Sequence, residues 1–396
     1  MARPKLRCQC TLKVQALERD LHAMMPPTQV GNSLSVARCH HIRALATFIA
    51  VAGFPLFAFM IASGMAPRQL SVLAASLRAL GSIEIVVIAV GAIPIPVALH
   101  ELGHLAAAMI VGFVPERLVL GPLSISRTRL SMGGWGGAWT ASRARPGQRA
   151  LLLRHWLTIA GGPIVNLLLG TASIYVASTW TNVAPGVQWF LVMVGIMAGL
   201  HLVGVMIPGT VNGITTDGLT LLVILRGGRA AQRLEANLRL AGENAAGIEP
   251  TEWDHKSIEI IRAFRCPTAE GASGRLLLVV PWLIAHGSWD EAWTELRHID
   301  RMSGVLVQSH MPMLLALKAI VMVHRKDLLT ARELLSKLPP RCMVPEQLVA
   351  CVEAALEPSR SAAELNAKAT GSWSPNTGTG VLWARLLHEH EHEHAG

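Results

Sequence analysis

Residues 85–113 read IVVIAVGAIPIPVALHELGHLAAAMIVGF, a long apolar stretch that is interrupted by His100, Glu101 and His104. An apolar run of this length can cross a bilayer as a helix. Ionisable side chains are costly in lipid and usually mark a functional site there. Pro96 suits the first turn of a helix, so the motif is expected to open a helical segment of its own. The stretch therefore predicts a membrane helix that carries chemistry.

The interruption has the pattern His-Glu-x-x-His. His100 and His104 are four residues apart, so on a helix they share a face and both imidazoles can reach one metal ion. Zinc binds neutral imidazole nitrogen, and a catalytic zinc site combines three protein ligands with one open position. Glu101 would lie beside that position and accept a proton from water. The pattern predicts one Zn²⁺ per chain. The alternative interpretation is a buried polar cluster that only joins helices.

A third metal ligand is expected from another membrane segment. Asp217 is the first choice, because the irregular loop 208–216 precedes it and non-helical backbone at membrane depth is tolerated where it lines a cavity. Asp217 could also cap the following helix. His201 is the second choice, and His155 is expected nearer the membrane interface.

The composition favours a multi-pass membrane protein. The chain of 396 residues is 51% hydrophobic and 15% charged, with a mean hydropathy of +0.41, whereas soluble domains carry about 25% charged residues. We expect about four spans, the third of them broken near Gly161-Gly162-Pro163. Their ranges are 44–66, 85–113, 151–178 and 187–207.

Between the second and third spans, residues 115–154 are polar and rich in arginine. The run Leu118 to Leu130 alternates like a β-hairpin arm, and the glycines between 133 and 137 mark a turn. The sequence thus predicts a small β element inside a mainly α-helical membrane domain.

The chain is expected to have four regions: a basic leader at 1–43, a membrane domain at 44–225, a soluble α-helical domain at 226–380 and a His/Glu-rich tail at 381–396. Two helical hairpins are expected in the soluble domain, with Ala292 and Ala331 at matching positions. They resemble tetratricopeptide repeats, and the alternative is an ordinary helical bundle. The tail is capable of binding metal, but the favoured interpretation is a solvated, disordered end.

The net charge of +9 is interpreted through membrane topology. Basic residues concentrate in the leader and in residues 115–154, which places both, with the soluble domain, on the cytoplasmic side of the cell membrane. No nucleic-acid partner is expected, because no motif of that class accompanies the charge. The six cysteines lack the repeated spacing of a disulfide framework.

Three segments occur in the order seen in a known family. They are HELGH at 100–104, AGGPIVN at 160–166, and the segment from Ile207-Pro208 to Thr216-Asp217-Gly218. With these segments the chain resembles the site-2 protease family of intramembrane zinc metalloproteases over about residues 80–225. It departs from the family at Val205, where an asparagine is common.

The resemblance implies zinc bound by His100, His104 and Asp217, with Glu101 as general base. It also implies that Asn166 lies near the metal and holds the substrate or the oxyanion. The alternative for Asn166 is hydrogen bonding between helices. An edge strand within Leu118 to Leu130 would pair with an extended substrate.

The predicted function is zinc-dependent cleavage of a membrane protein or peptide, with a protein partner bound by the soluble domain. One alternative is a catalytically silent membrane scaffold, against which the intact motif and Asp217 argue. Another is a zinc transporter or sensor that uses the tail, which would need more acidic residues within the membrane than the spans contain.

Overall fold

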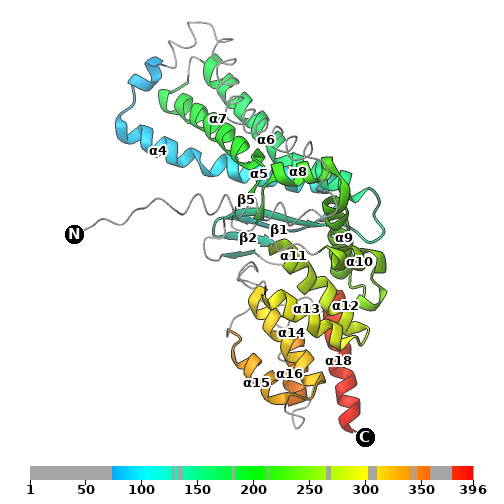
Figure 1. Cartoon of the computed structure of the whole chain (residues 1–396). Helices are drawn as coiled ribbons and strands as arrows, with labels where there is room; N and C mark the ends of the chain where they lie inside the picture. Colours follow the sequence, from blue (N-terminus) through cyan, green and yellow to red (C-terminus); the bar gives the residue numbers. More distant parts are fainter. Residues whose placement is uncertain are drawn as a thin grey trace, which may run out of the picture. The chain divides into compact units, whose positions relative to one another are not determined.

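The computed structural model describes residues 74–126, 130–132, 137–180, 183–211, 214–264, 269–301, 310–339, 344, 346–356 and 377–395. The predictions for the leader and for the span at 44–66 lie outside these residues. The described residues form two compact units, which meet in the chain between Glu243 and Asn244 (Figure 1).

The first unit is built on four apolar helices: α4 (Ser82–Ala92), α5 (Pro94–Ile110), α6 (Leu151–Thr179) and α7 (Pro185–Met206). Among the described residues, three segments are long and apolar enough to cross a membrane: α4 with α5, then α6, then α7. These segments agree closely with three of the predicted spans. α5 begins at Pro94, so the expectation that the motif opens its own helical segment is confirmed.

Large apolar side chains cover much of the outer surface of these helices, and they include Ile83, Val87, Leu168 and Val187. Contiguous apolar surface of this kind is unfavourable in water and marks contact with lipid or protein. The first unit therefore has the surface expected of a membrane-associated protein.

Small residues allow the helices to approach closely. A methyl group added at Gly103 of α5 would lie 2.6 Å from the carbonyl oxygen of Gly161 in α6. At the α6–α7 contact, the same addition at Gly195 would lie 2.6 Å from a side-chain carbon of Ile174. Glycine at such crossings brings two backbones together, which is typical of helix packing in membranes.

α6 is continuous from Leu151 to Thr179, with Pro163 inside it. The predicted break near Gly161-Gly162-Pro163 is therefore wrong. Pro163 removes one helical hydrogen bond, but membrane helices tolerate this loss where neighbouring helices support the segment. Here α5 packs against Gly161, two residues before the proline.

A four-stranded antiparallel sheet follows α5. Its strands are β1 (Val114–Leu120), β2 (Leu123–Ser126), β3 (Leu130–Met132) and β4 (Ala138–Arg143), in the order β3-β2-β1-β4. The predicted β element is present, but the expectation that Leu118 to Leu130 forms one arm is wrong. The chain reverses at Gly121-Pro122, because Gly121 adopts a φ of 59°, which favours glycine. Of the turn glycines, those at 133–136 lie outside the described residues.

The chain returns to the sheet region after α7. A short hairpin of β5 (Thr210–Val211) and β6 (Ile214–Thr215) leads into α8 (Asp217–Arg226) and α9 (Gly228–Ala245). In α9, Leu238 packs against a core that includes Phe113 and Ala144, and Gly242 lies against the carbonyl of Ala144. The composition changes at Arg226, whereas the first compact unit extends to Glu243.

The second unit is helical in its described residues. Two helix-turn-helix pairs are formed by α12 (Val280–Ala285) with α13 (Trp289–Arg301) and by α14 (Met311–His324) with α15 (Leu328–Ser336). Ala292 and Ala331, the matching small residues, are both fully buried. The likeness to tetratricopeptide repeats stays a prediction. The other elements are η2 (Pro250–Glu252), α10 (His255–Ala263), α11 (Ala269–Gly274), the π-helix η3 (Arg275–Val279), α16 (Glu346–Leu356) and α18 (Gly378–Ala395).

Residues 381–395 of the His/Glu-rich tail lie within α18, which ends at Ala395. The expectation of a disordered end is therefore wrong. The alternation of His and Glu does not oppose a helix, since glutamate is a good helix former and histidine is tolerated.

Candidate metal centre

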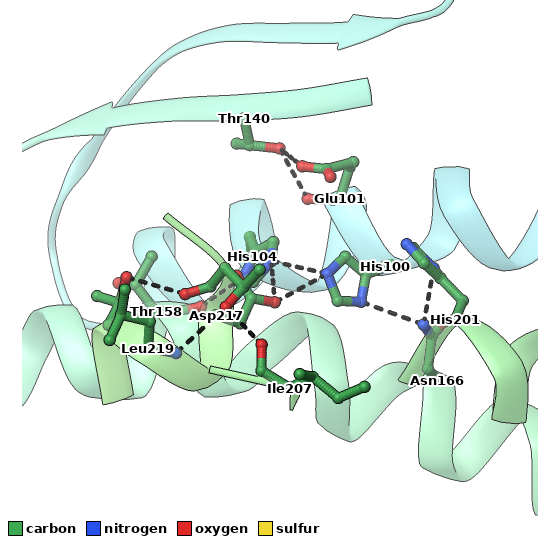
Figure 2. Close-up of polar contacts among 12 residues, drawn as sticks. His100, Glu101, His104, Thr140, Thr158, Asn166, His201, Ile207, Asp217 and Leu219 are labelled. Atoms are coloured by element: carbon green, nitrogen blue, oxygen red, sulfur yellow. Dashed lines mark hydrogen bonds and ion pairs between the residues drawn. The ribbon is translucent and has the colours of Figure 1, made fainter. Parts of the chain in front are cut away.

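Three side chains from two helices converge at one point in the first unit (Figure 2). His100 Nε2 and His104 Nε2 lie 3.0 Å apart, and the Asp217 Oδ2 atom lies 3.1 Å from the first and 3.3 Å from the second. Both histidines are buried. The structure thus brings together the three residues that the sequence singled out as ligands, and this group could hold a metal ion.

The spacing of the donor atoms suits a small tetrahedral ion. Ligands placed about 2 Å from zinc in tetrahedral geometry lie roughly 3.3 Å from one another. The observed separations of 3.0–3.3 Å match this value. Two imidazoles and a carboxylate are a donor set that zinc accepts, and they leave a fourth position for another group. The three side chains therefore fit the predicted zinc ion.

The start of α8 aims Asp217 at the histidines. Thr216 is the N-cap, since its side chain accepts a hydrogen bond from the backbone N–H of Leu219. The Thr216 N–H in turn donates to the carbonyl of Gly209, which fixes the end of the loop. Asp217 is thus not needed as the cap.

Glycines allow this close assembly. A methyl group at Gly218 would lie 2.0 Å from the carbonyl oxygen of Met206, so only glycine lets α8 start this close to the end of α7. A methyl group at Gly162 would lie 2.6 Å from His104 Nε2 and 2.7 Å from His100 Nε2. The missing side chain of Gly162 therefore provides space beside the donor atoms.

No protein-family model, curated protein or solved structure matches the chain. The functional interpretation rests on the residues and their geometry.

His104 is oriented by a backbone group. Its Nδ1 lies 2.9 Å from the carbonyl oxygen of Thr158 in α6. A carbonyl only accepts, so Nδ1 carries the proton and donates it. The lone pair of a neutral His104 is then at Nε2, on the side of Asp217.

Glu101 lies on the side of α5 that faces the sheet (Figure 2). Its buried carboxylate accepts a hydrogen bond of 2.8 Å from the Thr140 hydroxyl of β4. Glu101 is next to a candidate ligand in the chain, yet it is not a member of the three-residue group.

Asn166 and His201 form a second layer beside His100. The amide of Asn166 lies 3.2 Å from His100 Nδ1 and 3.0 Å from His201 Nδ1. The ring centroids of His201 and His100 are 4.7 Å apart. His201, the second choice as ligand, and His155 both stand outside the three-residue group.

Three residues of the site were not predicted as functional: Thr140, Thr158 and Gly162. Thr140 and Thr158 contact the motif through long-range packing, for which the sequence gives no local signal. The sequence contains one indication that Gly162 is functional, because this residue lies within the segment 160–166 that carried the family resemblance.

Proposed function

We propose that the chain is a zinc-dependent endopeptidase that hydrolyses peptide bonds of a membrane-associated protein or peptide, in or near the membrane. The observation that carries this proposal is the convergence of His100, His104 and Asp217, in a unit with helices long and apolar enough to cross a membrane. Glu101 follows His100 directly in the chain. The resemblance to the site-2 protease family, drawn from the three ordered segments, supports the same function.

In this proposal each residue has one task. His100, His104 and Asp217 hold the zinc ion, which supplies Lewis acidity toward water and toward the amide carbonyl. Glu101 accepts the proton of the attacking water. The hydroxyl of Thr140 holds the Glu101 carboxylate in place, and burial of the carboxylate keeps bulk water from competing with the reactant.

The substrate strand predicted within Leu118 to Leu130 needs a correction. β1 and β2 pair with strands on both sides, and of the described residues in this range only Leu130 belongs to an edge strand, β3. β4 is an edge strand, it packs against α5, and it carries Thr140. Unpaired strand edges accept extended peptides. We therefore assign the substrate-pairing strand to Ala138–Arg143.

The remaining expectations belong to the same proposal. The arginine-rich segment 115–154 and the second unit are cytoplasmic, in accord with the distribution of basic residues. The second unit binds a protein partner, because helical hairpins present extended surfaces for recognition. The alternative, a silent membrane scaffold, gives no reason for three metal-donor atoms to meet at tetrahedral spacing.

The test of the proposal is Glu101→Gln. Glutamine keeps the volume and a hydrogen-bonding head, but it cannot accept the proton of water. Loss of a general base costs about 100- to 10,000-fold in rate, so single-turnover cleavage of an accepted membrane peptide should fall by at least that factor. Zinc content and membrane yield should match the unmutated chain. An unchanged rate would rule out the hydrolytic role of the motif.

A further inference from the structure

Asn166 is fully buried on α6, between His100 of α5 and His201 of α7 (Figure 2). Its amide nitrogen Nδ2 faces Nδ1 of both imidazoles, at 3.2 Å and 3.0 Å. Its oxygen Oδ1 is buried and has no hydrogen-bond partner among the described residues. The amide therefore contacts two histidines with its nitrogen, while Oδ1, its only acceptor, has no partner among the described residues.

The direction of these hydrogen bonds fixes the proton of His100. An amide NH₂ group only donates, so Nδ1 of His100 must be an acceptor, and the proton of the neutral ring is on Nε2. On Nε2 the proton faces Asp217 Oδ2 and His104 Nε2. These atoms lie 3.1 Å and 3.0 Å from His100 Nε2. The network is self-consistent, but the lone pair of His100 Nε2 is then not available to a metal.

Zinc binding at His100 Nε2 needs the opposite tautomer, with the proton on Nδ1 and an acceptor beside it. His104 already meets this requirement, because the Thr158 carbonyl at its Nδ1 is always an acceptor. His100 meets it only if Asn166 presents oxygen in place of nitrogen. A turn of the carboxamide by about 180° exchanges the two atoms with almost no change of shape.

His201 can accompany both orientations of the amide. A neutral imidazole carries its single proton on either ring nitrogen. With the proton on Nε2, Nδ1 accepts from the amide NH₂. With the proton on Nδ1, the ring donates to the amide oxygen. A histidine at this position thus does not lock Asn166 in one orientation.

We propose that Asn166 is a positioning residue that sets the tautomer of the ligand His100. When zinc binds, the carboxamide turns over, and Oδ1 accepts from Nδ1–H of His100 and of His201. This inference rests on the zinc site of the proposed function. It differs from the role that the family resemblance implies, in which the amide touches the substrate or the oxyanion.

The test measures zinc affinity without any cleavage assay. Zinc dissociation constants of the purified full chain are determined by competition with a chelator, for the unmutated chain and for Asn166→Leu and Asn166→Asp. Loss of a partner of this kind typically weakens metal binding by about 10- to 100-fold, and we expect this for Asn166→Leu. Asn166→Asp offers two acceptor oxygens and no donor, so it should bind zinc at least as tightly as the unmutated chain.

The matched control is Gln188→Leu. Gln188 is also a buried amide in the first unit, where it donates to the carbonyl of Ala177 and accepts from Ser76. It has no contact with the metal centre among its hydrogen bonds, so this variant should keep native zinc affinity. The control separates a specific effect on His100 from the general loss of a buried amide.

Three outcomes would overturn the inference. Native zinc affinity in Asn166→Leu would mean that Asn166 contacts the substrate or only packs between helices. The proposed protease function would not be affected by this result. A defect in Asn166→Asp as large as that in Asn166→Leu would show that an acceptor at this position is not what matters. Absence of zinc binding in the unmutated chain would remove the inference and the proposed function together. Should Asn166→Leu fail to accumulate, the affinity of Asn166→Asp decides alone.

Discussion

Gly162 sets the free space of the metal centre, because any side chain there would point between the two imidazoles. Gly162→Ala should therefore exclude the metal while it leaves the fold intact. The added methyl group would lie within 2.7 Å of both Nε2 atoms, and alanine in place of glycine favours a helix by about 1 kcal/mol. We expect zinc affinity to fall by roughly 100-fold, of the order seen when a ligand environment is broken.

The comparison for Gly162→Ala is Gly204→Ala. Gly204 lies in α7, where a methyl group would meet no atom within 4 Å. Bound zinc per chain, measured by atomic absorption after purification, should drop only in the first variant. Equal zinc in both variants would place the metal elsewhere.

The identity of the third ligand can be tested directly. Asp217→Ala removes the oxygen that lies 3.1 Å and 3.3 Å from the two histidines, so bound zinc should fall from about one per chain to a small fraction. His201→Leu should retain zinc, because His201 stands outside the three-residue group. The reverse result would exchange the roles of these two residues.

Sequence could predict the ligands because their signal is local. The His-x-x-x-His spacing needs only a helix to bring His100 and His104 to one face, and Asp217 was the best of a few acidic or histidine side chains in the apolar segments. The partners Thr140, Thr158 and His201 lie 39, 54 and 35 residues from the side chains that they contact. Their positions depend on how the helices and the sheet pack, which no local pattern reveals.

At the scale of secondary-structure elements, β4 combines two features: it is an edge of the sheet, and its Thr140 holds Glu101. Thr140→Val keeps the β-branched shape that suits a strand and removes only the hydroxyl. A hydrogen bond to a charged group contributes about 1.5–3 kcal/mol, so cleavage should slow by roughly tenfold or more, with unchanged zinc content. Single-turnover rates check this.

The matched variant for Thr140→Val is Thr158→Val. Among the described residues, the Thr158 hydroxyl bonds only the Arg154 carbonyl in its own helix. The backbone carbonyl that orients His104 remains in this variant. This variant should cleave at the native rate. Equal rates in both valine variants would remove Thr140 from the mechanism.

Long apolar helices were predictable and the sheet was less so. Hydropathy alone marks α6 and α7, since a span needs about 20 apolar residues and little else. The run Leu118 to Leu130 covers the end of β1, all of β2 and the first residue of β3. Its alternation gave no indication of the reversal at Gly121-Pro122. Pro163 in α6 led to the opposite error, since a break was predicted where the helix is continuous. The helix continues because α5 supports it there in addition to its own hydrogen bonds.

At the scale of the whole molecule, the first unit should carry the metal centre without the second. A chain that ends at Glu243 keeps all but the last two residues of α9. It retains Leu238 and Gly242, which pack on Phe113 and Ala144. It should bind zinc as the full chain does. A chain that ends at Arg229 loses these contacts and should bind less zinc or fail to accumulate. Zinc content and yield in membranes are measured for both shortened chains. If the chain that ends at Glu243 lost its zinc, the second unit would be part of the site.

The donor atoms of the metal centre come from α5 and α8, which are more than one hundred residues apart in the chain. An ion shared by the two helices would act as a reversible cross-link that closes a very long loop. Closing such a loop costs conformational entropy in the unfolded chain, and an ion that binds only the folded form shifts unfolding to higher temperature by mass action. The availability of the ion would then govern how long the protein persists in the membrane as well as whether it acts, so a cell starved of the metal would lose the protein itself.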